Sequence, residues 1–263
     1  MTHGSSSLID VEHLVAHYGS HLILDDISFT VRQGEILVIL GASGSGKTTL
    51  LKHMVGLLRP TAGAVRYRGH DLVCMDEDER ADRLKTIGIS FQSGGLFNSL
   101  TLADNVALPL REHSAFDEAT IEALVRMKLS LVGLGDASHQ LPAELSGGMR
   151  KRAGVARALA LDPEIVFFDE PSAGLDPITA AGLDQMILTL RRLLGLTLIV
   201  ITHELESIRT VADRALMLDQ GKIIFLGSLE QIAESAHPRL QQFFQRRPDT
   251  VSTSALVASE ETG

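Results

Sequence analysis

The stretch GASGSGKTT, residues 41–49, constrains the fold more than any other part of the chain. It directly follows the apolar run 36–40, which is typical of a buried strand, and it precedes apolar residues at helical spacing. Strand, glycine-rich loop and helix in this order form the context that a phosphate-binding loop requires. Glycines there let backbone amides surround an anion at a helix N-terminus, where the helix dipole favours negative charge.

We therefore predict that this loop holds the phosphates of a nucleotide. Lys47 would reach the β- and γ-phosphates, and the hydroxyl of Thr48 would be a ligand of Mg²⁺. An ordinary glycine turn before a helix is the alternative, and the strand and helix on either side favour the phosphate-binding interpretation. The residues predicted to bind the nucleotide here are Gly41, Ser43, Gly44, Ser45, Gly46, Lys47, Thr48 and Thr49.

The composition is that of a globular protein, with 263 residues of which 44% are hydrophobic. The formal net charge of -9 argues against a nucleic-acid partner, because such binding depends on clustered Lys and Arg. Cys74 is the only cysteine in the sequence, which excludes an intramolecular disulfide and favours a reducing, cytoplasmic compartment. The N-terminal residues do not resemble a signal peptide, and the apolar segment 193–201 is too short to span a bilayer, so we expect membrane association only through a partner.

Two adjacent acids, Asp169 and Glu170, follow the continuous apolar run 165–168, which predicts a central parallel strand. Adjacent strand residues face opposite ways across the pleat. We therefore expect Asp169 to hold the metal and Glu170 to face the nucleophilic water. Acids that merely end a strand are the alternative, and the phosphate-binding loop in the same chain favours the catalytic interpretation.

Gln92 and His203 also follow predicted strands, 87–91 and 198–202. Open α/β sheets bind ligands beyond the carboxyl ends of their strands, so both side chains are expected to lie near the acids. Gln92 would ligate Mg²⁺ or orient a water through its amide oxygen. The alternatives are that Gln92 is merely a polar residue that ends a strand and that His203 is a structural histidine.

Residues 101–161 are predicted to be mostly helical, and they contain the sequence LSGGM at 145–149. Ser146 would cap the helix that begins there, and Gly147 and Gly148 would let its backbone approach another molecule. The next three residues, 150–152, are cations at the positive end of the helix dipole, where each costs about 0.3 to 1 kcal/mol. Either an anion binds at this helix end or the cations pair with carboxylates or solvent. The core residues predicted from helical spacing are Ile121, Leu124, Val125, Leu129 and Val132.

Residues 9–15 and 23–31 alternate between apolar and polar, which predicts antiparallel strands. Tyr18 lies between them, either as a packing residue on a turn or as an aromatic face that stacks on an adenine ring. The acidic and basic run 76–83 predicts a helix with a solvated face, and residues 215–225 predict a hairpin.

Together these segments resemble the nucleotide-binding subunit of an ABC transporter, because LSGGM matches that family's LSGGQ signature with Met149 in the glutamine position. The resemblance covers residues 8–227. It implies an α/β fold: a P-loop NTPase of the ABC ATPase type, a RecA-like core with an antiparallel β subdomain and an inserted α-helical subdomain. The implied divisions are a flexible tail 1–7, an ATPase domain 8–245 and a disordered tail 246–263. Within the ATPase domain, the nucleotide-binding core with its β subdomain would comprise 8–92 and 162–236, the helical subdomain 93–161 and the C-terminal helix 237–245.

The resemblance also implies ATP and Mg²⁺ as cofactors and a head-to-tail homodimer. Each ATP would lie between the loop of one copy and Ser146, Gly147 and Gly148 of the other. Asp176 would link the two sites and Tyr18 would stack on adenine. The implied catalytic residues are Glu170, His203, Lys47 and Gln92, and the implied metal ligands are Thr48, Gln92 and Asp169.

Three further segments, 91–113, LSGGMRKR and DPITA at 176–180, resemble the ATPases of Mla-type MCE systems, which move phospholipid between bacterial membranes. That resemblance implies integral membrane permease subunits, an MCE-type lipid-binding subunit and a place on the cytoplasmic face of the bacterial inner membrane. Residues 96–100 would border the groove for a permease helix. Residues 246–263 lack the aromatic-rich tail expected of that group.

Other functions remain as alternatives. ABC ATPases of importers or exporters for other substrates carry similar motifs. A soluble ABC-type ATPase acting on nucleic acid or ribosomes is less favoured, because this chain has neither a long inserted coiled coil nor two fused ATPase modules. A catalytically dead module is disfavoured by the intact Lys47, Asp169, Glu170 and His203.

Overall fold

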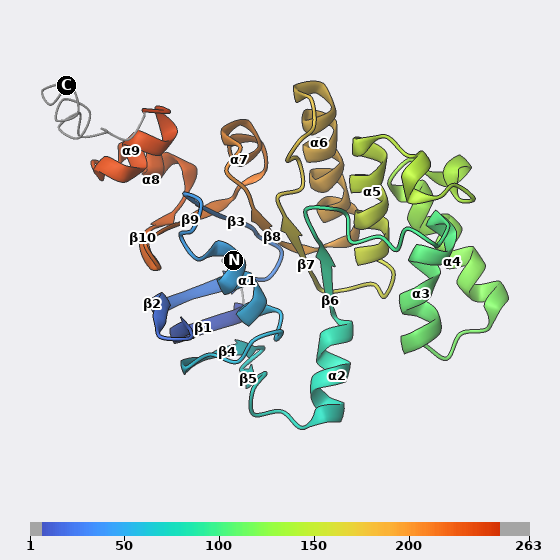
Figure 1. Cartoon of the computed structure of the whole chain (residues 1–263), viewed down its shortest axis with the longest axis horizontal. Coiled ribbons are helices and arrows are strands. Elements are labelled where there is room, and N and C mark those ends of the chain that lie inside the picture. Colours follow the sequence, from blue (N-terminus) through green and yellow to red (C-terminus); the bar gives the residue numbers. More distant parts are fainter. Residues whose placement is uncertain (1–6, 248–263) are drawn as a thin grey trace, which may run out of the picture.

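The protein is described here by a computed structural model that covers residues 7–247. The predicted tails 1–7 and 246–263 lie almost wholly outside these residues. Ser7, which the prediction placed in the first tail, is instead the first residue of a strand. Two sheets and a group of helices make up the described chain, and Figure 1 shows the helical group beside the larger sheet.

The larger sheet has six strands in the order β10-β9-β3-β8-β7-β6. The strands are β3 (Ile36–Gly41), β6 (Ile87–Ser90), β7 (Ile165–Asp169), β8 (Thr197–Ile201), β9 (Arg214–Asp219) and β10 (Lys222–Gly227). All neighbours pair in parallel except the hairpin of β9 and β10. Because both faces of β3 and β8 are covered, every residue of these strands is buried, as their continuous apolar sequences predict.

The smaller sheet is antiparallel, in the order β2-β1-β4-β5. Its strands are β1 (Ser7–Tyr18), β2 (His21–Arg32), β4 (Ala62–Tyr67) and β5 (His70–Asp71). One apolar face packs with Leu37 and Ile39 of β3 into a core, while Ile36, Val38 and Leu40 point into the other core. The central sheet therefore separates two hydrophobic cores, and the antiparallel sheet that the alternating pattern predicted covers one of its faces.

The helical group on the right of Figure 1 contains α3 (Leu102–His113), α4 (Glu118–Leu131) and α5 (Gly147–Ala158), with short 3₁₀ turns η1 (Gly135–Ala137) and η2 (Pro142–Glu144). The residues predicted as its core are buried, except Leu124, which is partly buried. Lys128 is also buried, at 1% exposure, and forms an ion pair with Asp162. This pair ties α4 to the chain just before β7.

The other helices are α1 (Lys47–Met54), α2 (Glu77–Lys85), α6 (Pro177–Leu194), α7 (Leu205–Val211), α8 (Leu229–Glu234) and α9 (Pro238–Phe244). α2 has only half-buried and exposed residues, as its charged sequence predicts, and Asp76 caps it. α1 ends at Met54, because Gly56 takes a left-handed conformation (φ 72°). Among residues 7–247, no helix is long and apolar enough to cross a bilayer.

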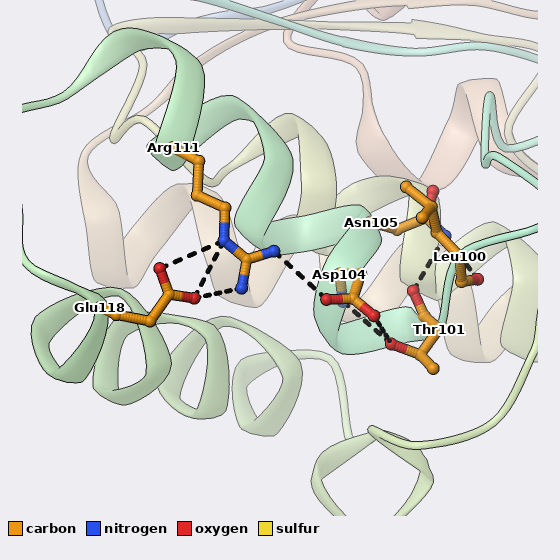
Figure 2. Close-up of polar contacts among 6 residues, drawn as sticks. All are labelled: Leu100, Thr101, Asp104, Asn105, Arg111 and Glu118. Carbon is orange, nitrogen blue, oxygen red and sulfur yellow. Dashed lines mark hydrogen bonds and ion pairs between the residues drawn. The ribbon is translucent and has the colours of Figure 1, made fainter.

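A loop before α3, residues 97–101, is held by the buried side chain of Asn105 (Figure 2). Its amide oxygen accepts a hydrogen bond from the Phe97 N–H (2.8 Å), and its amide nitrogen donates to the carbonyls of Phe97, Leu100 and Thr101. One side chain therefore fixes the whole loop. On the same helix, Arg111 contacts Asp104 and reaches Glu118 of α4, as Figure 2 shows.

Candidate active site

The phosphate-binding sequence forms the turn between β3 and α1. Gly41 has φ 151° and Gly46 has φ 104°, conformations that favour glycine. A β-carbon on Gly41 would lie 2.3 Å from the Leu218 carbonyl oxygen, and one on Gly46 would lie 2.7 Å from Leu24 Cδ2. The loop is therefore packed against β9 and β2 so tightly that side chains cannot replace these glycines.

Lys47 closes over this loop. Its ammonium donates to the carbonyl oxygens of Gly41 (2.8 Å) and Ala42 (2.9 Å). Burial lowers the pKa of Lys47, and the nearby carboxylates of Glu170 and Asp169 act in the opposite direction. The lysine charge is thus held inside the curve of the loop, where an anionic phosphate would meet it.

The polar residues at the ends of the central strands lie in one cleft with the loop. Gln92 follows β6, Asp169 ends β7, and His203 lies two residues after β8. The cleft has a volume of about 770 Å³. It is lined by Ile23, Gly41, Ala42, Ser43, Gly44, Gly46, Lys47, Thr48, Thr49, Gln92, Asp169, Glu170, Ile201, His203 and Phe243. The structure thus brings together most of the residues predicted to bind nucleotide and metal. It also places Ile23 and Phe243 in the cleft, and as apolar residues they gave no indication of a binding role in the sequence.

Glu170 differs from the predicted geometry. Its backbone turns into a left-handed conformation (φ 50°) just after β7 ends, so a turn rather than strand pleating sets the direction of its side chain. The N–H of Glu170 donates to the Ile201 carbonyl (2.8 Å), and its Oε1 lies 2.8 Å from His203 Nδ1. Its second carboxylate oxygen, Oε2, is buried and has no hydrogen-bond partner among the described residues. A buried acceptor in a cleft is well suited to bind a water molecule.

Asp169 lies in the same cleft, where its surroundings disfavour the negatively charged form of its carboxyl group. Burial raises its pKa, and the charge of Glu170 raises it further, while Lys47 acts in the opposite direction. The cleft also contains the Thr48 hydroxyl and the Gln92 amide. Carboxylate, hydroxyl and amide oxygens are the ligands that Mg²⁺ prefers, so this donor set fits the predicted metal.

Ser45 and Tyr18 are placed differently from the other predicted nucleotide contacts. Ser45 is buried behind the loop, and its hydroxyl has no hydrogen-bond partner in the part of the chain that the structure describes. Tyr18 ends β1 with 84% of its surface exposed, away from the residues that line the cleft. Its stacking on adenine stays a prediction.

The LSGGM segment lies on a different surface. Ser146 is exposed and caps α5, accepting a hydrogen bond from the Met149 N–H (3.2 Å). A β-carbon on Gly148 would lie 2.6 Å from Thr179 Cγ2, so this helix tip lies against the start of α6. Asp176 caps α6 there, accepting from the N–H groups of Ile178 and Thr179. The structure therefore groups Ser146, Gly147, Gly148 and Asp176, but not in the cleft of the same chain.

Each of the three cations after the signature residues donates to at least one backbone carbonyl. Arg150 donates to the Leu145 carbonyl, and Arg152 donates to the Val132 carbonyl. Lys151 is 8% exposed and donates to two carbonyls, those of Gln92 and Glu170. Backbone oxygens thus compensate these charges within the described chain, and an anion at this helix end stays a prediction. The link from Lys151 to the cleft is not predictable from the sequence, because it depends on which turn of α5 faces β6 and β7.

Comparisons with known proteins were made for the sequence and the fold. The family model described as "ABC transporter" matches residues 24–173. The phospholipid transport ATP-binding protein MlaF of Haemophilus influenzae is 41% identical over 245 residues, covering 93% of both chains. MlaF of Escherichia coli K12 is 39% identical, covering 92% of this chain and 90% of that one. A probable ribonucleotide transport ATP-binding protein, mkl, of Mycobacterium tuberculosis is 42% identical, covering 91% of this chain and 67% of that one.

Two solved structures of ABC ATPases are similar to this chain in fold. The ATP-binding cassette MJ0796, a dimer bound to ADP and Pi after hydrolysis, is 29% identical and has a TM-score of 0.76, covering 84% of this chain and 98% of that one. CbiO1 of Clostridium perfringens has a TM-score of 0.80 at 25% identity, covering 87% of this chain and 91% of that one. The predicted ABC ATPase fold is confirmed. The chain belongs to the ABC transporter family, as one of its ATP-hydrolysing, ATP-binding proteins.

Proposed function

We propose that this ATPase is the motor subunit of a lipid transporter, and that it drives phospholipid movement through a separate permease with an MCE-type subunit. The observation that carries the motor role is the buried, unpartnered Oε2 of Glu170 in the cleft beside Lys47 and Asp169. The lipid substrate is supported by the two relatives named as phospholipid transport proteins, which this chain matches over nine-tenths of both lengths.

Hydrolysis follows from the positions of these groups. Loop amides and the Lys47 ammonium hold the β- and γ-phosphates, and Glu170 Oε2 accepts a proton from the attacking water. His203, held by Glu170 Oε1, contacts the γ-phosphate. Mg²⁺, bound by Thr48, Gln92 and Asp169, would neutralise charge that builds up on the phosphate oxygens.

The active form in this proposal is a head-to-tail homodimer. Ser146, Gly147, Gly148 and Asp176 lie together on a surface outside the cleft of their own chain. A second copy, facing the other way, brings this surface over the nucleotide, so that each site has two chains around it. Closure on ATP and opening after hydrolysis would then move the permease.

The permease contact in this proposal is the loop that Asn105 holds. Phe97 is 48% exposed there, whereas Leu96 is half-buried because it packs against the helical core. The ATPase would bind the permease at this loop, on the cytoplasmic face of the bacterial inner membrane, and it needs no nucleic acid.

The test is to purify a tagged chain from native membranes and identify its partners. The proposal expects integral membrane subunits and an MCE-type subunit, together with ATP-dependent phospholipid transfer between vesicles that Glu170→Gln abolishes. Transfer of ribonucleotides in place of lipid would support the function named for the mycobacterial relatives. Recovery without any integral membrane protein would refute the transport role.

A further inference from the structure

Helix α5 carries the signature residues at its tip and also contacts the segment after β6 along one face. Lys151 donates to the Gln92 carbonyl, and Arg157 donates to the Gly95 carbonyl. Between them, a β-carbon on Gly154 would lie 2.6 Å from the Gly94 carbonyl oxygen. Residues three apart lie on one side of a helix. We call Lys151, Gly154 and Arg157 the α5 contact face.

Lys151 extends this contact to the backbone of Glu170, the residue that carries the carboxylate of the proposed base. Its ammonium also donates to the carbonyl oxygen of Glu170 at 2.9 Å. The side chain is buried, and burial lowers its pKa while Glu170 and Asp169 attract the charged form. One ammonium thus joins the ends of β6 and β7 to the helix that begins at Ser146. A buried charge is stable only when such partners compensate it, so the link is costly to break.

We infer that Lys151 is a positioning residue that couples the signature surface of each chain to the catalytic cleft of the same chain. When the tip of α5 engages the nucleotide of a second copy, Lys151 transfers the displacement of the helix to Gln92 and Glu170. The inference rests on the proposed head-to-tail dimer.

The contacts are of a kind that transmits small movements. Gly154 and Gly94 touch backbone to backbone, so at this point no side chain separates α5 from the segment. The Glu170 N–H is fixed to the Ile201 carbonyl. A displacement of the Glu170 carbonyl that is taken up by rotation about the N–Cα bond of Glu170 also redirects its carboxylate. Binding at one site would in this way prepare the base at the other.

The experiment compares the wild type with Lys151→Met, Lys151→Arg and Lys128→Met, each full-length and purified with its membrane partners. Lys128 is a matched control, because it is another buried lysine of the helical group. It forms its ion pair with Asp162 and not with a residue of the cleft. Affinity is measured with a non-hydrolysable ATP analogue, and hydrolysis rates are measured against ATP concentration to give kcat and the Hill coefficient. Lys151→Gln replaces Lys151→Met if the latter does not fold.

We expect Lys151→Met to bind the analogue like the wild type, while its kcat falls by about tenfold and its Hill coefficient falls from near two to one. Lys151→Arg, which keeps a cation with several donors, should recover cooperativity. Lys128→Met should lose thermal stability but keep the Hill coefficient. A cooperative Lys151→Met with wild-type kcat would overturn the inference, as would an equal loss in Lys128→Met. A wild type without cooperativity would instead refute the proposed dimeric function.

Discussion

Replacing Glu170 with glutamine tests the centre of the proposed chemistry. The substitution keeps the size of the side chain, and an amide oxygen can still face His203 Nδ1, which lies 2.8 Å from Oε1 in the native protein. What is lost is the negative charge and the proton acceptor at Oε2, which is buried in the cleft. The perturbation is therefore confined to base chemistry and local charge.

The size of the effect follows from these two losses. A positioned general base contributes roughly 10² to 10⁴ in rate, so kcat should fall by that factor, or about 2.7 to 5.5 kcal/mol in the barrier. ATP affinity should be kept or increased, because the substitution removes a negative charge from the cleft that receives the anionic phosphates. In the native protein this charge also raises the pKa of Asp169. Bound ATP that is not hydrolysed should then hold the dimer closed.

Two assays measure this prediction. Phosphate release at saturating ATP gives kcat, and size-exclusion chromatography with ATP and Mg²⁺ reports the closed dimer. Glu204→Gln is the matched control, since its carboxylate lies 3.8 Å from His203 Nε2 but is 51% exposed, and it should retain nearly full activity. If Glu170→Gln hydrolyses ATP within about threefold of the wild type, the assignment of the base is wrong.

Three other substitutions test separate parts of the structure. Lys47→Ala should weaken ATP binding by about ten- to a hundredfold, the effect of losing a charged hydrogen bond, in equilibrium titrations with a fluorescent analogue; unchanged affinity would contradict the role of Lys47. Asn105→Ala leaves buried loop groups unpaired, so unfolding free energy from urea titration should fall by about 2 to 4 kcal/mol, and a fall below about 0.5 kcal/mol would show that the loop does not depend on Asn105. Burial raises the pKa of Asp184, so its folded form binds protons more tightly and stability falls as pH rises above the unfolded pKa. Asp184→Asn should therefore melt higher than the wild type at pH 8, with a difference that shrinks toward pH 4, and a difference that grows there would refute this reasoning.

The sequence predicted those parts of the site whose geometry depends on neighbours along the chain. The apolar runs before Gly41, Asp169 and His203 identify parallel strands, and parallel strands end at the same edge of a sheet. These residues therefore meet in one cleft whatever the details of the loops. Glycine-rich turns were equally predictable, because residues such as Gly41 adopt conformations closed to other side chains.

Features that depend on packing between distant segments were not predictable in this way. Glu170 lies beyond the end of its strand in a left-handed conformation that is uncommon for a residue other than glycine, so the pleating rule does not apply to it. The cations after the signature residues bond to carbonyls of segments up to 59 residues away in sequence. Leu96, in the segment expected to border a permease groove, packs on the helical core. Each outcome was decided by tertiary contacts that local patterns do not contain.

The hydrogen bonds by which Asn105 holds the loop 97–101, two of which are drawn in Figure 2, also affect how this loop would associate with another protein. Phe97 is held on both its N–H and its carbonyl by Asn105, and the guanidinium of Arg157 lies 4.8 Å from its ring centre. Immobilising a free side chain on association costs about 0.5 to 1.5 kcal/mol in entropy. Because Phe97 is already ordered before any encounter, most of that loss has occurred during folding, and more of its contact energy remains for affinity.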